Sequence, residues 1–347
     1  MSTAIPKTMR AIMLRNPGPP SSLQIETIPT PTPQPGQVLI KVRAFGLNRS
    51  EVFTRQGHSP IREVPLPRIL GIESVGTVAA VVEEDGAGKD GLKVGDKVAT
   101  CVGGMGRAFD GGYAEFCVVP RGQVVRVGVE AGLEELGWDI WGALPEMIQT
   151  SWGSLFSSLK LKKDDSLLIR GGTSSIGLAA AALASHHGAI VTSTTQQPSR
   201  TQLLLDAGAH HVIIDPACGL ISPTTNTRFD KILELVGPTT LDDSFKLLKA
   251  GGILCQAGIC GGKWILENWN PFALGAVYFT SYASSVDRFL ETPLDRVAGL
   301  VRDGKIRIPI RAFEGLGEIG EAHRIMEMEG AAGKIVVVGV DISCSIY

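Results

Sequence analysis

The 347-residue chain has no strong excess of charge of either sign. Its 33 Lys and Arg residues nearly balance 35 Asp and Glu residues, which leaves a formal net charge of -2 at pH 7. A protein that binds nucleic acid or anionic lipid by electrostatics needs a basic surface, and this balance gives no sign of one. We therefore expect neither a nucleic-acid nor a membrane partner.

Long hydrophobic runs are also missing, because no segment reaches the roughly 18 consecutive apolar residues that span a bilayer. The N-terminal stretch Met1–Pro20 has early prolines and no apolar signal core. The final residues match neither a peroxisomal tripeptide nor a prenylation box. The expected location is the cytoplasm.

Metal and disulfide motifs are absent from the chain as well. The cysteines form no Cys-x-x-Cys pair, and the histidines form no His-Glu-x-x-His spacing. In a chain of this length the cysteines are expected to be reduced thiols, most of them buried. The cysteines are Cys101, Cys117, Cys218, Cys255, Cys260 and Cys344.

The overall amino-acid composition indicates a globular protein with a well-buried core. Hydrophobic residues make up 44% and charged residues 20%, which excludes disorder. The length suggests two domains. The 42 glycines exceed the usual share of about 7% and favour many tight turns or a nucleotide-binding scaffold.

The first part of the chain, to about residue 125, predicts a β-rich domain. Short apolar runs alternate there with Gly and Pro turns, as in barrels and sandwiches. The proline-dense stretch Pro29–Pro35 predicts an extended connection, with a recognition segment as the alternative. The predicted strands cover residues 38–42, 74–82, 94–98 and 113–119.

From about residue 136 the pattern changes to apolar strands that alternate with helices. This alternation predicts a parallel sheet covered by helices on both faces. The helices are expected within 143–159, 176–187 and 200–207. The strands are expected at 166–170, 189–194, 212–214, 231–236 and 252–257, and a final strand at 334–338.

A loop of small residues, Gly171–Gly177, lies between a predicted strand and an Ala-rich helix. Small residues let the backbone approach a pyrophosphate, and a helix N-terminus directs N–H groups at that anion. We predict that Ser174, Ser175 and Ile176 contact a dinucleotide. The spacing is Gly-x-x-Ser-x-x-Gly rather than Gly-x-Gly-x-x-Gly, so an ordinary strand–helix turn is the alternative.

The end of the next strand predicts which dinucleotide binds. An NAD site usually has an acidic residue there for the ribose hydroxyls. This chain has Thr194 and Thr195 instead, followed by Arg200. Hydroxyls and a guanidinium suit a 2′-phosphate, which favours NADPH as the cofactor. The alternative for Arg200 is a solvated helix residue.

Several short motifs carry a family resemblance through their order and spacing, and they run almost from one end of the chain to the other. The chain resembles the zinc-independent medium-chain dehydrogenase/reductases of the quinone oxidoreductase-like group. The resemblance implies a GroES-like β-rich catalytic domain, residues 1–135 with 285–347, and a Rossmann doubly wound domain, residues 136–284. The motifs are Gly46–Glu51, Arg55–Gly57, Pro67–Glu73, Val94–Val98, Gly111–Phe116, Gly171–Gly177, Glu234–Gly237 and Gly333–Val337.

The same resemblance argues against zinc. Zinc-dependent relatives have a Cys at the position of Asn48 and a His at that of Ile72. Their four-cysteine lobe would fall between residues 98 and 112, where this chain has only Cys101. We therefore expect no metal in either site.

The implied activity is NADPH-dependent hydride transfer to a quinone or to the β-carbon of an α,β-unsaturated carbonyl, which needs no metal to ionise a hydroxyl. One alternative is an enoyl thioester reductase of a fatty-acid, polyketide or secondary-metabolite pathway. Another is a non-catalytic NADPH-binding protein. The substrate is then a small molecule, and the family implies a homodimer.

By resemblance, Asn48 lies near the nicotinamide and is expected to position or polarise the acceptor carbonyl. Its alternative is a loop residue that caps its own backbone. Phe53 stands where relatives often have tyrosine, so it would form an apolar wall rather than donate a proton. Trp264 and Trp269 are expected in the acceptor pocket, or alternatively in packing contacts.

The remaining cofactor contacts are also implied by the resemblance. Thr150 is expected close to the cofactor, Val236 and Gly237 beside its adenosine half, and Gly258 and Ile259 beside the nicotinamide. Each of them has a turn or core residue as its alternative. All lie where open α/β sheets bind ligands.

Overall fold

The computed structural model describes residues 4–58, 63–83, 91–130, 132–134, 136–215, 219, 221–222, 225–267, 269–328 and 332–340. The chain forms two compact units. Unit 1 comprises Met1–Glu146, Ser285–Arg302 and Ile310–Tyr347, and unit 2 comprises Met147–Ser284 and Asp303–Pro309. The first boundary falls after residue 146 rather than 135, because helix α2 (Trp138–Ala143) packs on the strands of unit 1.

Unit 1 is built on a largely antiparallel sheet with the order β15-β16-β3-β5-β6-β8, in which β7 also pairs with β3. A smaller sheet has the order β2-β1-β4. The strands are β1 (Thr8–Leu14), β2 (Leu23–Pro29), β3 (Gln37–Gly46), β4 (Arg68–Ile69), β5 (Glu73–Val82), β6 (Lys97–Cys101), β7 (Phe116–Pro120), β8 (Val124–Arg126), β15 (Ile310–Glu314) and β16 (Lys334–Val338).

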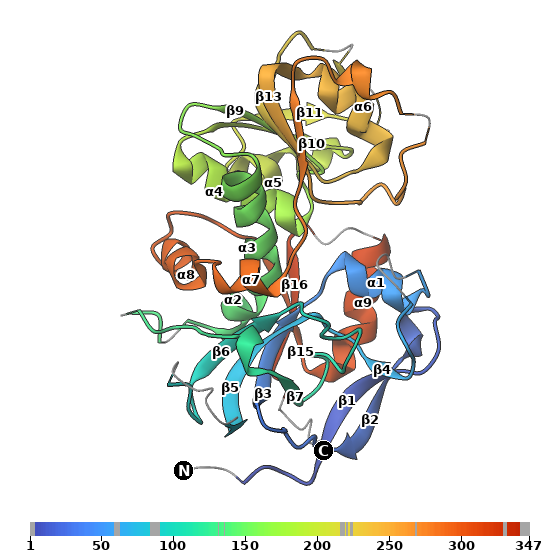
Figure 1. Cartoon of the computed structure of the whole chain (residues 1–347), viewed down its shortest axis with the longest axis vertical. Coiled ribbons are helices and arrows are strands. Elements are labelled where there is room, and N and C mark those ends of the chain that lie inside the picture. The colour runs from blue at the N-terminus through green and yellow to red at the C-terminus, as the bar shows by residue number, and fades with distance from the viewer. Residues whose placement is uncertain are drawn as a thin grey trace. The chain divides into compact units, whose positions relative to one another are not determined.

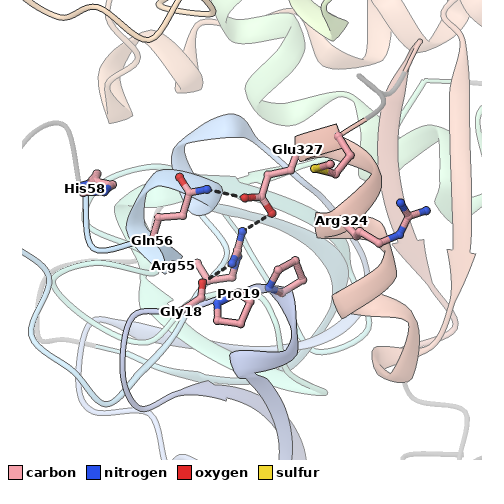
Figure 2. A pocket seen from close by; sticks show the side chains of 9 residues that line it. Gly18, Pro19, Arg55, Gln56, His58, Arg324 and Glu327 are labelled. Atoms are coloured by element: carbon pink, nitrogen blue, oxygen red, sulfur yellow. Dashed lines mark hydrogen bonds and ion pairs between the residues drawn. The ribbon is translucent and has the colours of Figure 1, made fainter.

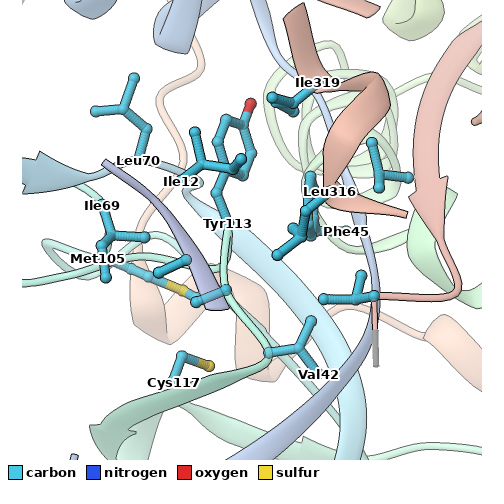
Figure 3. Close-up of a cluster of buried hydrophobic side chains, with 14 of the residues drawn as sticks. Ile12, Val42, Phe45, Ile69, Leu70, Met105, Tyr113, Cys117, Leu316 and Ile319 are labelled. Atoms are coloured by element: carbon cyan, nitrogen blue, oxygen red, sulfur yellow. The ribbon is translucent and has the colours of Figure 1, made fainter. Parts of the chain in front are cut away.

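The core of unit 1 lies between these strands and helix α9, as Figure 3 shows. Tyr113 is fully buried in it, stacked on Phe45 with ring centroids 4.6 Å apart. Its hydroxyl lies 3.2 Å from Nε2 of His323, so this buried polar group has a partner. The helices of this unit are α1 (Arg49–Arg55), α2, α7 (Val286–Leu290), α8 (Leu294–Arg302) and α9 (Ile319–Met328).

Unit 2 contains one parallel sheet with the order β11-β10-β9-β12-β13-β14. In chain order this is 3-2-1-4-5-6, the order of the Rossmann fold, so the expected doubly wound domain is confirmed. Because the strands are parallel, the C-terminal ends of β9 and β12 lie at the same edge of the sheet. The strands are β9 (Ser166–Arg170), β10 (Ile190–Thr195), β11 (His211–Ile214), β12 (Phe229–Glu234), β13 (Leu248–Gln256) and β14 (Tyr278–Ser281).

The helices of unit 2 cover this sheet. Helix α4 packs on β9 and β10, and α6 packs on β12 and β13; Figure 1 shows the two helices on either side of the strands. The described residues include no helix that is long and apolar enough to cross a membrane. The helices are α3 (Pro145–Trp152), α4 (Ser175–His187), α5 (Thr201–Asp206) and α6 (Pro238–Lys246), and a π-helix, η3, spans Gly153–Ser158.

Several predicted elements differ from the structure at their ends, among them the following three. The helix expected within 143–159 changes to a π-helix after Trp152. The strand expected at 94–98 begins only at Lys97, because Gly95 has a φ of 95° and residues 93–96 form a turn. The strand expected at 113–119 begins at Phe116, because the Tyr113 N–H donates to the Leu70 carbonyl instead of to a sheet neighbour.

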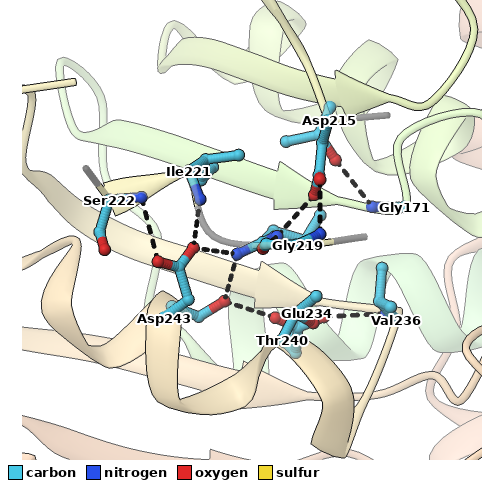
Figure 4. A network of polar contacts seen from close by, with 12 residues as sticks. Gly171, Asp215, Gly219, Ile221, Ser222, Glu234, Val236, Thr240 and Asp243 are labelled. Carbon is cyan, nitrogen blue, oxygen red and sulfur yellow. Dashed lines mark hydrogen bonds and ion pairs between the residues drawn. The ribbon is translucent and has the colours of Figure 1, made fainter. Parts of the chain in front are cut away.

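A buried arginine holds the strand ends of unit 2 together. Figure 4 shows Asp215 and Asp243 in this network of polar contacts. Arg170, the last residue of β9, forms ion pairs of 2.6 Å with Asp215 and with Asp243. The Asp243 carboxylate also accepts the N–H groups of Ile221 and Ser222. These contacts attach the segment after β11 to helix α6.

We predict that Arg170→Met lowers the free energy of unfolding of unit 2 by about 3–5 kcal/mol, because it leaves two buried carboxylates without their cation. Lys249→Met is the control, since the Lys249–Asp230 pair is largely exposed and contributes about 0–1 kcal/mol. Denaturant unfolding of both variants measures the difference. Equal losses would contradict the structural role of Arg170.

Candidate functional site

The loop after β9 is fixed by hydrogen bonds from its own residues and from β10. Gly171 has a φ of 79°, a left-handed conformation that favours glycine. Its N–H donates to the Thr194 hydroxyl at 3.2 Å, and the Gly172 N–H donates to the Thr194 carbonyl at 3.1 Å. Thr194 therefore holds the loop in place from the neighbouring strand.

Ser174 caps helix α4 with its side chain. Its hydroxyl accepts the Gly177 N–H at 3.1 Å and donates to the Gly171 carbonyl at 2.8 Å. The first N–H groups of a helix have no partner inside it, so this cap leaves those of Ser175 and Ile176 available to an anion. Their position at the N-terminus of a 13-residue helix suits a pyrophosphate.

Gly177 allows the helix to approach the loop closely. A Cβ atom at this position would lie 2.6 Å from the Gly171 carbonyl oxygen and 2.7 Å from that of Gly172. Both distances are too short, so only glycine fits. The loop geometry therefore fits a dinucleotide, although the literal Gly-x-Gly-x-x-Gly spacing is absent.

The residues predicted to select the cofactor lie at and after the end of β10. Thr194 and Thr195 are buried, and the Thr195 hydroxyl bonds the backbone of Gln197 as both donor and acceptor. Arg200 is half-buried at the end of a short 3-10 turn, η4 (Pro198–Arg200). The Thr195 hydroxyl thus shapes the turn that carries Arg200.

Four predicted cofactor residues come together at the ends of β12 and β13. The Glu234 carboxylate accepts the N–H groups of Val236 and Gly237 at 2.8 and 3.2 Å. Gly237 has a φ of 108°, and a Cβ atom there would lie 3.5 Å from the Gly258 oxygen and 3.5 Å from the Ile259 Cα. Burial raises the pKa of Glu234 despite its hydrogen bonds.

The other predicted residues lie on separate elements. Thr150 is buried on α3, and its hydroxyl lies 3.0 Å from that of Ser284. Trp269 packs against Phe245 and Phe279 beside the core of unit 2. Trp264 is 44% exposed. Phe53 is half-buried on α1 of unit 1.

Asn48 belongs to a cluster of buried charged groups in unit 1. Its amide nitrogen donates to Glu73 at 2.8 Å and to Glu51 at 3.4 Å, and its oxygen accepts from the Lys334 ammonium at 2.6 Å. The two amide hydrogens are thus directed at carboxylates. This differs from the expected donor to an acceptor carbonyl and from a loop residue that caps its own backbone.

Lys334 is the cation of this cluster. Its ammonium lies 2.6 Å from Oε1 of Glu73, and both side chains are fully buried. Burial alone would lower the pKa of Lys334, but the carboxylates of Glu73 and Glu146 outweigh burial and raise it. The second oxygen of Glu73 accepts the Glu146 N–H at 2.8 Å.

Glu51 is the second buried carboxyl group and is 2% exposed. Its Oε1 accepts the Ile72 N–H at 3.1 Å, and its Oε2 lies 3.2 Å from the Ser50 hydroxyl. Burial raises the pKa of Glu51 to about 7, against the lowering effects of the Ile72 bond and Lys334. The cluster therefore has one cation near two buried carboxyl groups.

These residues do not fit a zinc site. Asn48 and Ile72 offer an amide and an apolar side chain where zinc would need a thiolate and an imidazole. The Lys334 ammonium already lies within 2.6 Å of both Glu73 and Asn48. Among the residues that the structure describes, no group of three or more His, Cys, Asp or Glu side chains is arranged to hold a metal.

A separate hollow of about 580 Å³ lies on unit 1 between the ends of α1 and α9. Figure 2 shows Arg55 and Gln56 directed at the Glu327 carboxylate, with Arg55 also donating to the Gly18 carbonyl. Arg55 and Glu327 therefore neutralise one another. His58 lies at its rim and is exposed.

Sequence reasoning missed Glu51, Lys334 and the partners of Arg170. One signal was present, since Lys334 begins an apolar strand and Arg170 ends one, and a charge in such a run needs a buried partner. The partners are far away in sequence: Glu73 is 261 residues from Lys334, and Asp243 is 73 residues from Arg170. Only the fold identifies them.

Two known families match the chain. Residues 34–129 match the alcohol dehydrogenase GroES-like domain, and residues 207–337 match the zinc-binding dehydrogenases. The first match confirms the expected GroES-like domain. Among the described residues, no donor set corresponds to the zinc in the second family's description.

Individual relatives cover nearly the whole chain. The rat quinone oxidoreductase is 28% identical over 340 residues, which cover 96% of this chain and 98% of the relative. The AibC crystal structure superposes with a TM-score of 0.81 at 27% identity and 96% coverage of both chains. Mycobacterial Rv1454c, solved in complex with NADPH, has a TM-score of 0.80 at 26% identity and covers 95% of this chain and 99% of its own.

The Rossmann strand order, the glycine loop, the GroES-like match and full-length similarity to quinone oxidoreductases agree with one another. The chain belongs to the medium-chain dehydrogenase/reductase family, in its quinone oxidoreductase-like group.

Proposed function

We propose that this protein is a cytoplasmic, NADPH-dependent oxidoreductase that reduces a quinone or the double bond of an α,β-unsaturated carbonyl without zinc. The observation that carries the proposal is the Lys334 ammonium, which contacts Glu73 and also Asn48, the residue that stands where a zinc-dependent relative has a cysteine. NADPH supplies the hydride when it is bound. The chain must then hold the cofactor, orient the acceptor and provide a proton.

The cofactor part of the proposal rests on the strand ends of unit 2. Ser175 and Ile176 offer N–H groups to the pyrophosphate, and Arg200 offers a guanidinium to the 2′-phosphate. Val236, Gly237, Gly258 and Ile259 are proposed to offer backbone surface to the cofactor. The Glu234 carboxylate accepts the Val236 and Gly237 N–H groups, and its carbonyl oxygen accepts the Gly258 N–H. The NADPH complex of Rv1454c supports the same assignment.

Stopped-flow absorbance of the nicotinamide tests the function against a panel of quinones, enones and enoyl thioesters, with the protein pretreated with a strong chelator. We expect oxidation of NADPH by a quinone or an enone at an unchanged rate after chelation. Turnover with thioesters alone would indicate an enoyl thioester reductase instead. Binding of NADPH with no oxidation by any acceptor would indicate a non-catalytic binding protein.

Arg200→Ala should weaken NADPH binding about ten- to a hundredfold, because one charge-assisted contact contributes about 1.5–3 kcal/mol. NADH binding should change little, since NADH has no 2′-phosphate. Calorimetric titration with both nucleotides measures the difference, and Arg228→Ala serves as an exposed-arginine control in the same unit. Equal losses for both nucleotides would contradict the 2′-phosphate assignment.

Asn48→Ala should lower the rate of hydride transfer by about tenfold and leave NADPH affinity nearly unchanged. The amide joins Lys334 to two carboxyl groups, and its loss disturbs the groups beside the proposed acceptor position. Single-turnover kinetics measure this rate. Asn270→Ala is the control, because that asparagine only caps a short turn of unit 2. An unchanged rate would make Asn48 purely structural.

We also propose a homodimer that forms along the edge of the unit 2 sheet. Strand β14 ends the sheet order, and Tyr278 and Phe279 on it are 66% and 42% exposed. Phe272, just before it, is 93% exposed. An open edge with aromatic side chains favours pairing with a second copy. Light scattering should give twice the chain mass, and a single-chain mass at all concentrations would contradict this.

A further inference from the structure

The buried cluster of unit 1 contains more carboxyl groups than cations. Glu51 and Glu73 are 2% and 0% exposed, and Lys334 is the ammonium between Asn48 and Glu73. Glu73 is in direct contact with Lys334, whereas the hydrogen-bond donors to Glu51 are neutral groups. Desolvation disfavours a second uncompensated charge, so the buried group of Glu51, Glu73 and Lys334 is neutral when Glu51 holds a proton. The half-buried Glu146 adds a further negative charge that acts on Lys334.

The two oxygens of Glu51 have different surroundings. Oε1 accepts the Ile72 N–H at 3.1 Å and the Asn48 amide at 3.4 Å. Oε2 lies 3.2 Å from the Ser50 hydroxyl, and Ser50 is half-buried while Glu51 is buried. Oε2 is therefore the oxygen from which a proton can pass to a hydroxyl that is nearer to solvent.

We propose that Glu51 stores the proton that the reduced acceptor takes up, and that the Ser50 hydroxyl delivers it. This inference rests on the proposed function, which needs a proton source that Phe53 cannot provide because it lacks a hydroxyl. Ser50 lies two residues after Asn48 at the start of α1, so it belongs to the segment that the family resemblance places near the nicotinamide.

A hydride from NADPH forms a C–H bond at the β-carbon, and the electron pair of the double bond moves onto the carbonyl oxygen as an enolate. The enolate takes the Ser50 hydroxyl proton as Ser50 takes the proton from Oε2 of Glu51. Glu51 is left as a carboxylate and regains a proton from water through Ser50. NADPH is oxidised, and the acceptor gains two electrons and two hydrogens.

The electrostatics of the cluster agree with this role. Burial raises the pKa of Glu51 to about 7, near the range in which a proton donor is most effective. The groups that face it are Glu73 of β5, which raises its pKa, and Lys334 of β16, which lowers it. Cys101 of β6 and Tyr113 also interact with it, but burial raises the pKa of both well above their usual values, so neither is charged near pH 7.

Infrared spectroscopy of the cofactor-free protein tests proton storage directly. We expect the C=O band of a protonated carboxyl group that disappears as pH rises through about 7 and is absent in Glu51→Gln. Glu234→Gln, which changes a buried carboxyl group of unit 2, should leave this band in place. Absence of such a band from the unmodified protein would overturn the proposal.

Kinetics of Ser50 variants test delivery, and these variants leave the charged side chains of the cluster intact. Ser50→Ala should lower the rate of product protonation by about 10- to 100-fold, whereas Ser50→Thr retains a hydroxyl and should retain most of the rate. The unmodified protein should lose rate above pH 7, and Glu51→Gln should be slow at every pH.

Different results would contradict the proposed function and the proton-transfer role of Glu51 and Ser50. If no acceptor oxidises NADPH, the proposed function is wrong, and the infrared band still shows whether Glu51 holds the proton. If turnover occurs but Ser50→Ala matches Ser50→Thr, the delivery step is overturned. A loss above pH 7 that persists in Glu51→Gln would also overturn it, because another group would then supply the proton.

Discussion

The ion pair between Lys334 and Glu73 is the contact on which the arrangement of unit 1 depends. It is fully buried, so its charges must compensate each other within 2.6 Å. It joins β16, near the end of the chain, to β5 and to the Asn48 segment before α1. Gly46 has no Cβ atom because one would overlap Glu73 and Lys334. The β3–β16 pairing and the start of α1 are therefore set around one ammonium group.

This arrangement links the absence of zinc ligands to the chemistry that we propose. An amide and an isoleucine cannot hold zinc, and the fixed ammonium makes the site still less favourable for a second cation. Reduction of an activated double bond needs a hydride, an oriented acceptor and a proton. In our proposal the cluster provides the proton. Glu51 and Glu73 lie near a single ammonium group, so Glu51 holds a proton. Unit 2 is proposed to hold NADPH, the source of the hydride. Arg170 and Glu234 fix the strand ends at which NADPH is proposed to bind.

Local sequence patterns predicted most of the fold and only part of the site. The apolar runs at 166–170 and 334–338 match β9 and β16, because most residues buried in a sheet are apolar. The glycine loop and the Ser174 cap follow equally local rules. The role of Asn48 was not predictable in this way, since its partners Glu73 and Lys334 come from distant strands. The π-helix after Trp152 and the packing of Trp269 depend likewise on tertiary contacts.

The position of deuterium in the product tests the central claim most directly. Protein stripped of metal would be given an enone and NADPH that carries deuterium at the transferred position. The account predicts product with deuterium on the β-carbon, formed at the same rate as before metal removal. Deuterium on the carbonyl carbon, or product formed only after zinc is added back, would contradict it.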